Sequence, residues 1–350
     1  MSRPPRPTLL RTRTRDGWSI AVWNYAGSGR KTPVLLVHGL GSNRHDLDAP
    51  DERYSLARYL HQDGFDVWMV ELRGAGASNH RLKKALRGFS IDDYILHDLP
   101  AAQRLIADET GVESVHWIGH SLGGTLAYPL IATNQERIRS AVTLGAPTMK
   151  RADHRKLEFT LPVVIAALKL VPYWWGYKRI AQLGSYAMNL SGPLLAKVFF
   201  TLDNCELDHL GPIGRCAIDD VPSGVTLQML DWYRERRMTT HYGTLDPVEA
   251  LERTRTPLMV VCGSKDRLTP LEDVRVAYDR SGAESKELLV CGREQGFSAD
   301  YGHIDLVFGR RAREEVFPRL RDWLRKHDEP VRAGNGAAAP ASASPERGRV

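Results

Sequence analysis

The segment 119–124, Gly-His-Ser-Leu-Gly-Gly, places a serine between closely spaced glycines. A serine hydroxyl is a weak nucleophile unless the chain holds it at an exposed, strained point beside a base. A turn from a strand into a helix provides such a point, and Gly119 and Gly123 permit it because side chains there would collide with the neighbouring elements. The pattern follows an apolar run and precedes a helix-like segment, so we expect Ser121, preceded by His120, to be a nucleophile.

Acyl transfer at this serine would need two backbone N–H groups aimed at the developing oxyanion. We expect the first from Leu122, directly after the nucleophile. A glycine-rich loop that begins with His38 and Gly39 follows another apolar run. The N–H of Leu40 in this loop is the candidate for the second donor.

A serine nucleophile also needs a general base and an acid that orients it. Of the twelve histidines, His303 and His327 lie beyond the penultimate expected strand. His327 ends the final helix-like segment, whereas His303 follows a glycine in a loop, so we expect His303 to be the base.

The acid should lie on a loop that follows the preceding strand. Asp266 comes shortly after the apolar run 258–261 and is therefore the candidate. Asp246 competes from the side of a large insertion. Asp305 competes as well, but it lies only two residues from the histidine and is badly placed to grip its ring.

These residues need a scaffold, and short β-rich runs alternate along the chain with segments of helix length. Such alternation predicts an α/β fold with a mostly parallel central sheet covered by helices. The expected strands are 18–25, 34–37, 67–70, 115–118, 141–144, 258–261 and 288–290, and the expected helices include 54–63, 91–110, 125–133 and 311–326.

The alternation breaks over residues 148–251, which contain no clear buried strand. They include an apolar stretch at 161–171 and a helix-like segment at 224–237. Their aromatic and proline content predicts a helical cap over a binding cleft, while ordinary extra helices of the core are the alternative. The α/β core would then comprise residues 16–147 and 252–328.

The net charge of +6 over 350 residues lies at the two ends of the chain. Five arginines and no acid precede Asp16, so residues 1–15 are expected to form a basic, disordered arm, and the Ala-, Gly- and Pro-rich residues 329–350 a disordered tail. The body is near neutral, which argues against a nucleic-acid partner. A short basic arm can touch acidic lipid heads, which leaves a transient contact with a lipid surface open.

Other features exclude further classes of protein. The four cysteines form no CxxC pair and have no ligand spacing with histidine, so neither a disulfide framework nor a zinc site is expected. The N-terminus is basic but lacks the apolar region of a secretory signal, and the most apolar stretch is too short for a bilayer. We therefore expect a cytoplasmic protein; the sequence predicts no particular oligomeric state.

Further motifs flank the candidate residues. The segment 71–78, Glu-Leu-Arg-Gly-Ala-Gly-Ala-Ser, is similar to a D-x-R-G-x-G-x-S motif, with Glu71 in place of aspartate. With this motif and the order serine, aspartate, histidine, residues 18–326 resemble the α/β-hydrolase superfamily. Segments 94–101 and 301–305 resemble acid-lipase-like enzymes and polyhydroxyalkanoate-synthase-like proteins in particular.

Those synthases use a cysteine nucleophile, and epoxide hydrolases and haloalkane dehalogenases use an aspartate. A serine at this position therefore favours hydrolysis of a small-molecule or lipid-like carboxylic ester with an apolar acyl or alcohol group, as in a lipase or carboxylesterase. The resemblance implies an acyl-enzyme on Ser121 and no cofactor or metal. An acyltransferase or thioesterase with the same triad is an alternative, and the complete triad argues against a third, a non-catalytic binding protein.

Overall fold

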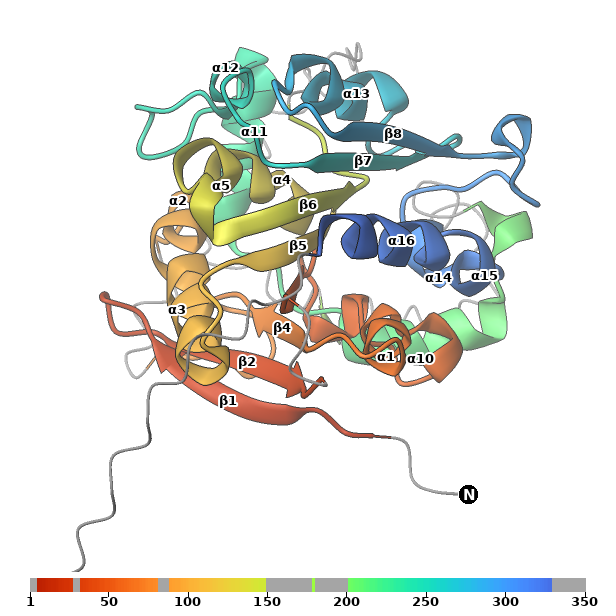
Figure 1. Cartoon of the computed structure of the whole chain (residues 1–350), viewed down its shortest axis with the longest axis horizontal. Coiled ribbons are helices and arrows are strands. Elements are labelled where there is room, and N and C mark those ends of the chain that lie inside the picture. The colour runs from red at the N-terminus through yellow and green to blue at the C-terminus, as the bar shows by residue number, and fades with distance from the viewer. Residues whose placement is uncertain (1–4, 28–31, 81–87, 149–177, 180–200, 329–350) are drawn as a thin grey trace, which may run out of the picture.

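The computed structural model describes residues 5–27, 32–80, 88–148, 178–179 and 201–328. An eight-stranded sheet runs through its centre in the order β1-β2-β4-β3-β5-β6-β7-β8 (Figure 1). The β1/β2 and β2/β4 pairs are antiparallel, and the other neighbouring strands are parallel. The strands are β1 (Thr8–Arg13), β2 (Ser19–Tyr25), β3 (Val34–Val37), β4 (Val67–Glu71), β5 (Val115–His120), β6 (Ile138–Leu144), β7 (Leu258–Gly263) and β8 (Lys286–Cys291).

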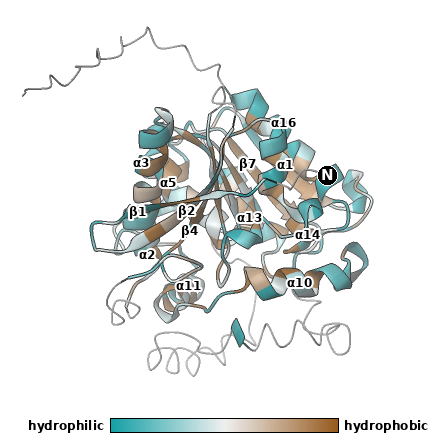
Figure 2. Cartoon of the chain, turned by 90° about the horizontal axis from the view of Figure 1, so that it is seen from below, coloured by the Kyte–Doolittle hydropathy of each residue, from teal (hydrophilic) through white to brown (hydrophobic). Residues whose placement is uncertain are grey.

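The central strands are continuous apolar runs because helices cover both faces of the sheet. In β3, Leu35 and Val37 join one hydrophobic core, whereas Val34 and Leu36 join the other. Figure 2 shows the sheet between α3 and α5 on one side and α1 and α16 on the other. The predicted α/β fold with a mostly parallel sheet is thus confirmed.

Residues of α2, α3, α4, α5, α11, α12 and α13 contribute to the first core, and residues of α1, α10, α14, α15 and α16 to the second. These helices are α1 (Leu56–Gln62), α2 (Ile91–Asp93), α3 (Leu99–Thr110), α4 (Leu122–Thr125), α5 (Ala127–Thr133), α10 (Leu207–Ala217), α11 (Ser223–Glu235), α12 (Pro247–Leu251), α13 (Leu271–Arg280), α14 (Asp305–Phe308), α15 (Ala312–Glu315) and α16 (Phe317–His327).

The prediction that residues 1–15 form a disordered arm is wrong for Thr8–Arg13, which form the edge strand β1 and pair with β2. Alternate side chains of this strand point to opposite faces. Arg11 and Arg13 are exposed on one face, while Leu10 on the other packs against the first core. An edge strand needs apolar residues on one face only, and the arginines on the other face hide that weak signal in the sequence.

The described helices between β6 and β7 include α10, α11 and α12, and α11 lies at the predicted helix 224–237. The apolar stretch 161–171 and the predicted tail 329–350 lie outside the described residues. The prediction that residues 148–251 form a cap therefore stays a prediction. In the described part of the chain, none of the helices combines the length and the apolarity needed to cross a bilayer.

Arg73, in the loop after β4, ties three segments together from a buried position. Its side chain is 1% exposed. It donates to Asp98 (2.9 Å) and to Asp16 (2.7 Å), and it lies 3.3 Å from Asp93. Asp98 is fully buried as well, so each of the two charges compensates a partner that would be costly to bury alone.

We expect Arg73→Met to lower the free energy of unfolding by about 3–5 kcal/mol, because Asp98 would remain buried without its cation. Urea unfolding followed by circular dichroism measures this loss. Arg275→Met is the matched control, since Arg275 pairs with Asp279 on the surface with 55% and 46% of the side chains exposed. The control should lose no more than about 1 kcal/mol, and equal losses in both variants would contradict the prediction.

Candidate active site

Ser121 lies on a sharp turn between β5 and α4. Its backbone has φ 53° and ψ −120°, a conformation that costs of the order of 1–3 kcal/mol for a residue other than glycine. The neighbouring glycines permit the turn: a Cβ at Gly119 would lie 2.1 Å from the carbonyl oxygen of Gly123, and one at Gly123 would lie 2.1 Å from that of Val37. The N–H of Ser121 donates to the carbonyl oxygen of Leu144 (2.7 Å), which fixes the serine at the carboxyl ends of β3, β5 and β6.

The predicted oxyanion donors, Leu40 and Leu122, line one common pocket. Within the described ranges, no hydrogen bond from either main-chain N–H to another residue is present, so both donors remain available for a bound oxygen. Gly39 brings their loop against the nucleophile, because a Cβ at Gly39 would lie 3.2 Å from the Cβ of Ser121. A side chain at this position would be a tight fit against the nucleophile, so glycine favours the close approach of the loop.

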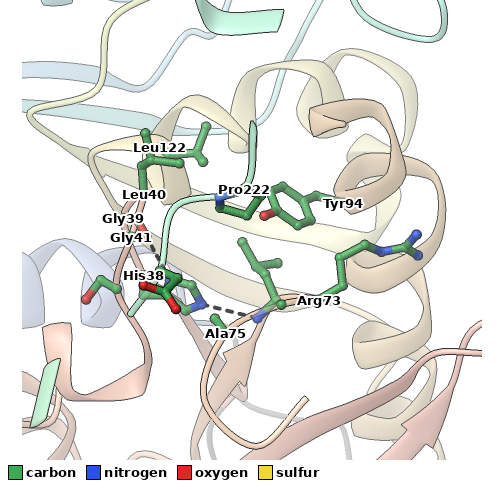
Figure 3. Close-up of a pocket in the computed structure, with 13 residues that line it drawn as sticks. His38, Gly39, Leu40, Gly41, Arg73, Ala75, Tyr94, Leu122 and Pro222 are labelled. Atoms are coloured by element: carbon green, nitrogen blue, oxygen red, sulfur yellow. Dashed lines mark hydrogen bonds between the residues drawn. The ribbon is translucent and has the colours of Figure 1, made fainter. Parts of the chain in front are cut away.

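His38 holds that loop to the next one. Its Nδ1 lies 2.8 Å from the carbonyl oxygen of Gly39, and its Nε2 accepts the N–H of Leu72 (3.1 Å; Figure 3). Nδ1 faces an oxygen that only accepts hydrogen bonds, and Nε2 itself accepts one. The ring is therefore assigned as a neutral imidazole with its proton on Nδ1. His38 thus connects the loops after β3 and β4.

His303 and Asp266 are in direct contact. His303 Nδ1 lies 2.8 Å from Oδ2 of Asp266, and both side chains are buried. The ionised carboxylate only accepts, so Nδ1 carries the proton and Nε2 is left to accept one. Asp266 also accepts the hydroxyl of Thr269 (2.7 Å) and its N–H (2.8 Å). Burial by itself raises the pKa of Asp266, but the hydrogen bonds from His303 and Thr269 hold it below its usual value.

Two contacts connect this pair with the nucleophile turn. The residue after Leu144 is Gly145, with φ +55°, and a Cβ there would lie 2.9 Å from Nδ1 of His303. The rings of His120 and His303 have their centroids 5.0 Å apart. The structure thus brings the predicted serine, histidine and aspartate to one edge of the sheet, from the ends of β5, β7 and β8.

The competing candidates have other partners. Asp246 is the N-cap of α12 and accepts Nε of Arg237 (2.8 Å). Asp305 accepts Nδ2 of Asn204 (3.0 Å) instead of binding the imidazole. His327 ends α16, and the last turn of that helix binds its Nδ1. Among the described residues, none of the three forms a hydrogen bond or an ion pair with the side chain of the candidate base.

A pocket opens beside the two predicted oxyanion donors (Figure 3). Its walls come from the loops after β3 and β4, the start of α4, the π-helical segment Tyr94–Asp98 before α3 and the chain before α11. The guanidinium of Arg73 points away from Leu40 and Leu122. The lining residues are His38, Gly39, Leu40, Gly41, Ser42, Leu72, Arg73, Gly74, Ala75, Tyr94, Leu122, Asp220 and Pro222.

The chain between α10 and α11 is bonded to the loop that carries Leu40. Ile218 forms an isolated bridge with Ser42. The carboxylate of Asp219 is buried and accepts Nδ2 of Asn43 (2.9 Å) and the N–H of Gly76 (2.8 Å). The segment between α10 and α11 therefore stabilises the loop that carries Leu40.

One group among the described residues has the spacing of a metal site, namely Asp16, Asp93 and His97. Arg73 Nη1 lies 2.7 Å from Asp16 and 3.3 Å from Asp93. The cation that these carboxylates bind is therefore the guanidinium of the cluster described above.

Sequence reasoning missed two residues that shape the site. Thr269 had a local signal, since a threonine three residues after Asp266 can bind it with both N–H and hydroxyl. Asp219 had none, because its partners Asn43 and Gly76 lie 176 and 143 residues away.

The chain also matches known proteins. The family model described as alpha/beta hydrolase fold matches residues 32–309. The gastric triacylglycerol lipase of Rattus norvegicus is 32% identical over 349 residues, covering 88% of this chain and 85% of that protein. The poly(3-hydroxyalkanoate) polymerase subunit of Haloferax mediterranei is 23% identical over 312 residues, covering 85% and 59% respectively.

Among solved structures, a thermophilic esterase from Thermogutta terrifontis has a TM-score of 0.59 at 17% identity, covering 91% of this chain and 99% of that one. The fold, the family match and the relatives agree. The chain belongs to the α/β-hydrolase fold family, which confirms the resemblance noted in the sequence.

The lowered pKa of Asp266 predicts how stability depends on pH. An acid with a lowered native pKa stabilises the fold above its unfolded pKa, about 3.9 for aspartate, and this contribution is lost as pH falls through the native pKa. The difference in free energy of unfolding between wild type and Asp266→Asn should therefore be largest above about pH 5 and shrink below about pH 4.

Urea unfolding at a series of pH values measures this difference. Asp246→Asn serves as the control, because asparagine can still cap α12 and its curve should run parallel to that of the wild type. A difference between wild type and Asp266→Asn that grew with acidification would contradict the prediction.

Proposed function

We propose that this chain is a serine hydrolase that cleaves carboxylic esters through an acyl-enzyme on Ser121. The observation that carries the proposal is the 2.8 Å contact between His303 Nδ1 and Asp266. This contact leaves the other imidazole nitrogen free to act as a base, at the edge of the sheet that also carries a serine held on a strained turn. In this proposal the predicted triad and the N–H groups of Leu40 and Leu122 form the catalytic site.

The reaction proceeds in two steps. His303 Nε2 removes the proton of Ser121 Oγ as the oxygen attacks the ester carbonyl, and the N–H groups of Leu40 and Leu122 stabilise the oxyanion. The protonated imidazole, oriented by Asp266, gives its proton to the departing alcohol. Water, deprotonated by the same histidine, then attacks the acyl-enzyme; the imidazolium returns the proton to Ser121 Oγ as its bond to the acyl carbon breaks, and the acid is released. These steps use only the protein's own residues and water.

An apolar ester is the substrate class that the pocket supports. Beside the oxyanion donors, Leu72, Tyr94 and Pro222 supply apolar wall, which suits an acyl chain or an apolar alcohol more than a charged group. Relatives named as lipases, such as the gastric triacylglycerol lipase at 32% identity, support a lipid-like ester.

An acyltransferase or thioesterase with the same triad is the second candidate. The specific observation in its favour is the similarity to a poly(3-hydroxyalkanoate) polymerase subunit. In such an enzyme the acyl group on Ser121 would pass to an alcohol, or would come from a thioester, with the same histidine moving the proton. A non-catalytic binding protein is disfavoured, because binding alone requires neither a strained serine nor an oriented imidazole.

A fluorophosphonate probe should label wild-type protein at one site and leave Ser121→Ala unlabelled, because the probe reacts only with an activated serine. Asp266→Asn should slow labelling and ester hydrolysis by up to about 10⁴-fold, since the imidazole would be held in the wrong tautomer. Asp246→Asn is the control and should react at the wild-type rate. An unlabelled wild type, or equal labelling of Ser121→Ala, would exclude the enzyme.

The acceptor preference separates hydrolase from transferase. With a panel of p-nitrophenyl esters, we expect free acid as the main product even when an alcohol or a thiol is added at millimolar concentration. Chromatography of the acyl products measures the partition between water and acceptor. A product mixture dominated by the new ester or thioester would favour the second candidate.

A further inference from the structure

Asp46 and His120 form a buried contact behind the proposed site. Asp46 ends the short 3-10 helix η1 (Arg44–Asp46), which follows the loop of Leu40, and His120 immediately precedes Ser121. His120 Nδ1 lies 3.0 Å from Oδ2 and 3.1 Å from Oδ1 of Asp46. The two side chains are 2% and 6% exposed, so water does not screen this contact.

Each member of the pair also holds a second loop. Oδ2 of Asp46 accepts the N–H of Gly39 (2.8 Å), the residue directly before Leu40. His120 Nε2 lies 3.2 Å from the main-chain carbonyl oxygen of His303. The pair therefore touches the oxyanion loop, the nucleophile turn and the base loop at once.

These contacts determine the protonation of the imidazole. Both ring nitrogens of His120 face oxygens that accept hydrogen bonds, a carboxylate and a peptide carbonyl. A neutral imidazole can donate from one nitrogen only, whereas the imidazolium donates from both. The arrangement is satisfied when His120 is a cation and Asp46 an anion.

The surrounding charges agree with this protonation. Burial by itself lowers the pKa of His120. Asp46, the carbonyl of His303 and the carboxylate of Asp266 all raise it, and together they outweigh the effect of burial. Burial raises the pKa of Asp46, but the charge and hydrogen bond of His120 and the N–H of Gly39 bring it below its usual value. The ring of His303, with its centroid 5.0 Å from that of His120, is a further titratable neighbour.

We propose that Asp46 and His120 form an ion pair that positions the catalytic loops relative to one another. The inference rests on the proposed function, because it assigns the pair its effect through Leu40, Ser121 and His303. Neither residue lines the pocket, so neither is proposed to touch substrate. The pair acts by fixing where the oxyanion donors and the base lie around the serine.

A positioning role predicts which kinetic constant changes. Misplacing catalytic groups by about 1 Å can cost 10²-fold in rate. A group that matters only in the transition state lowers kcat and kcat/KM together and leaves KM unchanged. We therefore expect loss of the pair to appear in kcat and in the rate of fluorophosphonate labelling.

The test uses Asp46→Asn, His120→Asn and the double variant in the full chain, with a p-nitrophenyl ester as substrate. Each single variant should lower kcat by about 10- to 100-fold with little change in KM. The double variant should lose no more than the worse single one, because the partners act as a unit. His120→Gln, which can place an amide near the His303 carbonyl, should retain more activity than His120→Ala.

His116→Gln is the matched control. His116 lies near the start of the same strand, at the opposite end of β5 from the turn; it is buried and binds Ser140 through Nδ1 (2.8 Å). This variant should lower Tm and leave kcat per labelled active site unchanged. If Asp46 and His120 served stability alone, their variants would also show a lower Tm with an unchanged kcat per labelled active site, and the proposal would be wrong.

NMR of ¹⁵N-histidine-labelled wild type tests the charge of His120 in the unaltered pair. Both nitrogens of His120 should be protonated throughout the pH range of activity, with the signal assigned from its loss in His120→Asn. A neutral His120, normal kcat in Asp46→Asn, or multiplicative losses in the double variant would each overturn the proposal. Failure of the proposed function is distinct, since the wild type would then not be labelled at Ser121.

Discussion

The close approach of α4 to β3 and β5 is the constraint on which the candidate site depends. Gly119 and Gly123 leave no room for a Cβ, so the helix begins directly above the sheet and the residue between them must turn with φ 53°. Hydrogen bonds stabilise this unfavourable backbone conformation. The N–H of Ser121 donates to the carbonyl oxygen of Leu144, and the first N–H groups of the helix donate to the carbonyl oxygen of Ser121. A larger residue at either glycine would displace the hydroxyl and the N–H of Leu122 together.

Described residues of the chain between β6 and β7 take part in this geometry. Asp219 binds the loop of Leu40 through Asn43, and Asp305 binds Asn204 from a position just after the base loop. A buried carboxylate left without its donors is costly, so both attachments favour a single arrangement of insertion and core. A change in the insertion can therefore reach both the oxyanion loop and the base loop.

Much of the fold could be predicted because of where the strands lie. The inner strands are buried on both faces, so their sequences are short, fully apolar runs that stand out between helices; β3 matches its prediction at both ends. The edge strand β1 could not be recognised in the same way, because its exposed arginines resemble those of a solvated arm. The serine turn was readable because its signal, glycines around Ser121, is local.

The sequence by itself determined the residue types and their order: a serine between glycines, then Asp266, then His303. Their meeting point follows from the general rule that parallel strands share one carboxyl edge. Only the tertiary structure decided which other groups surround them, because the sheet order sets β3 beside β5 and so brings Asp46 against His120 across 74 residues. No local pattern encodes such a contact, since it depends on two loops that meet only after the strands beneath them have paired.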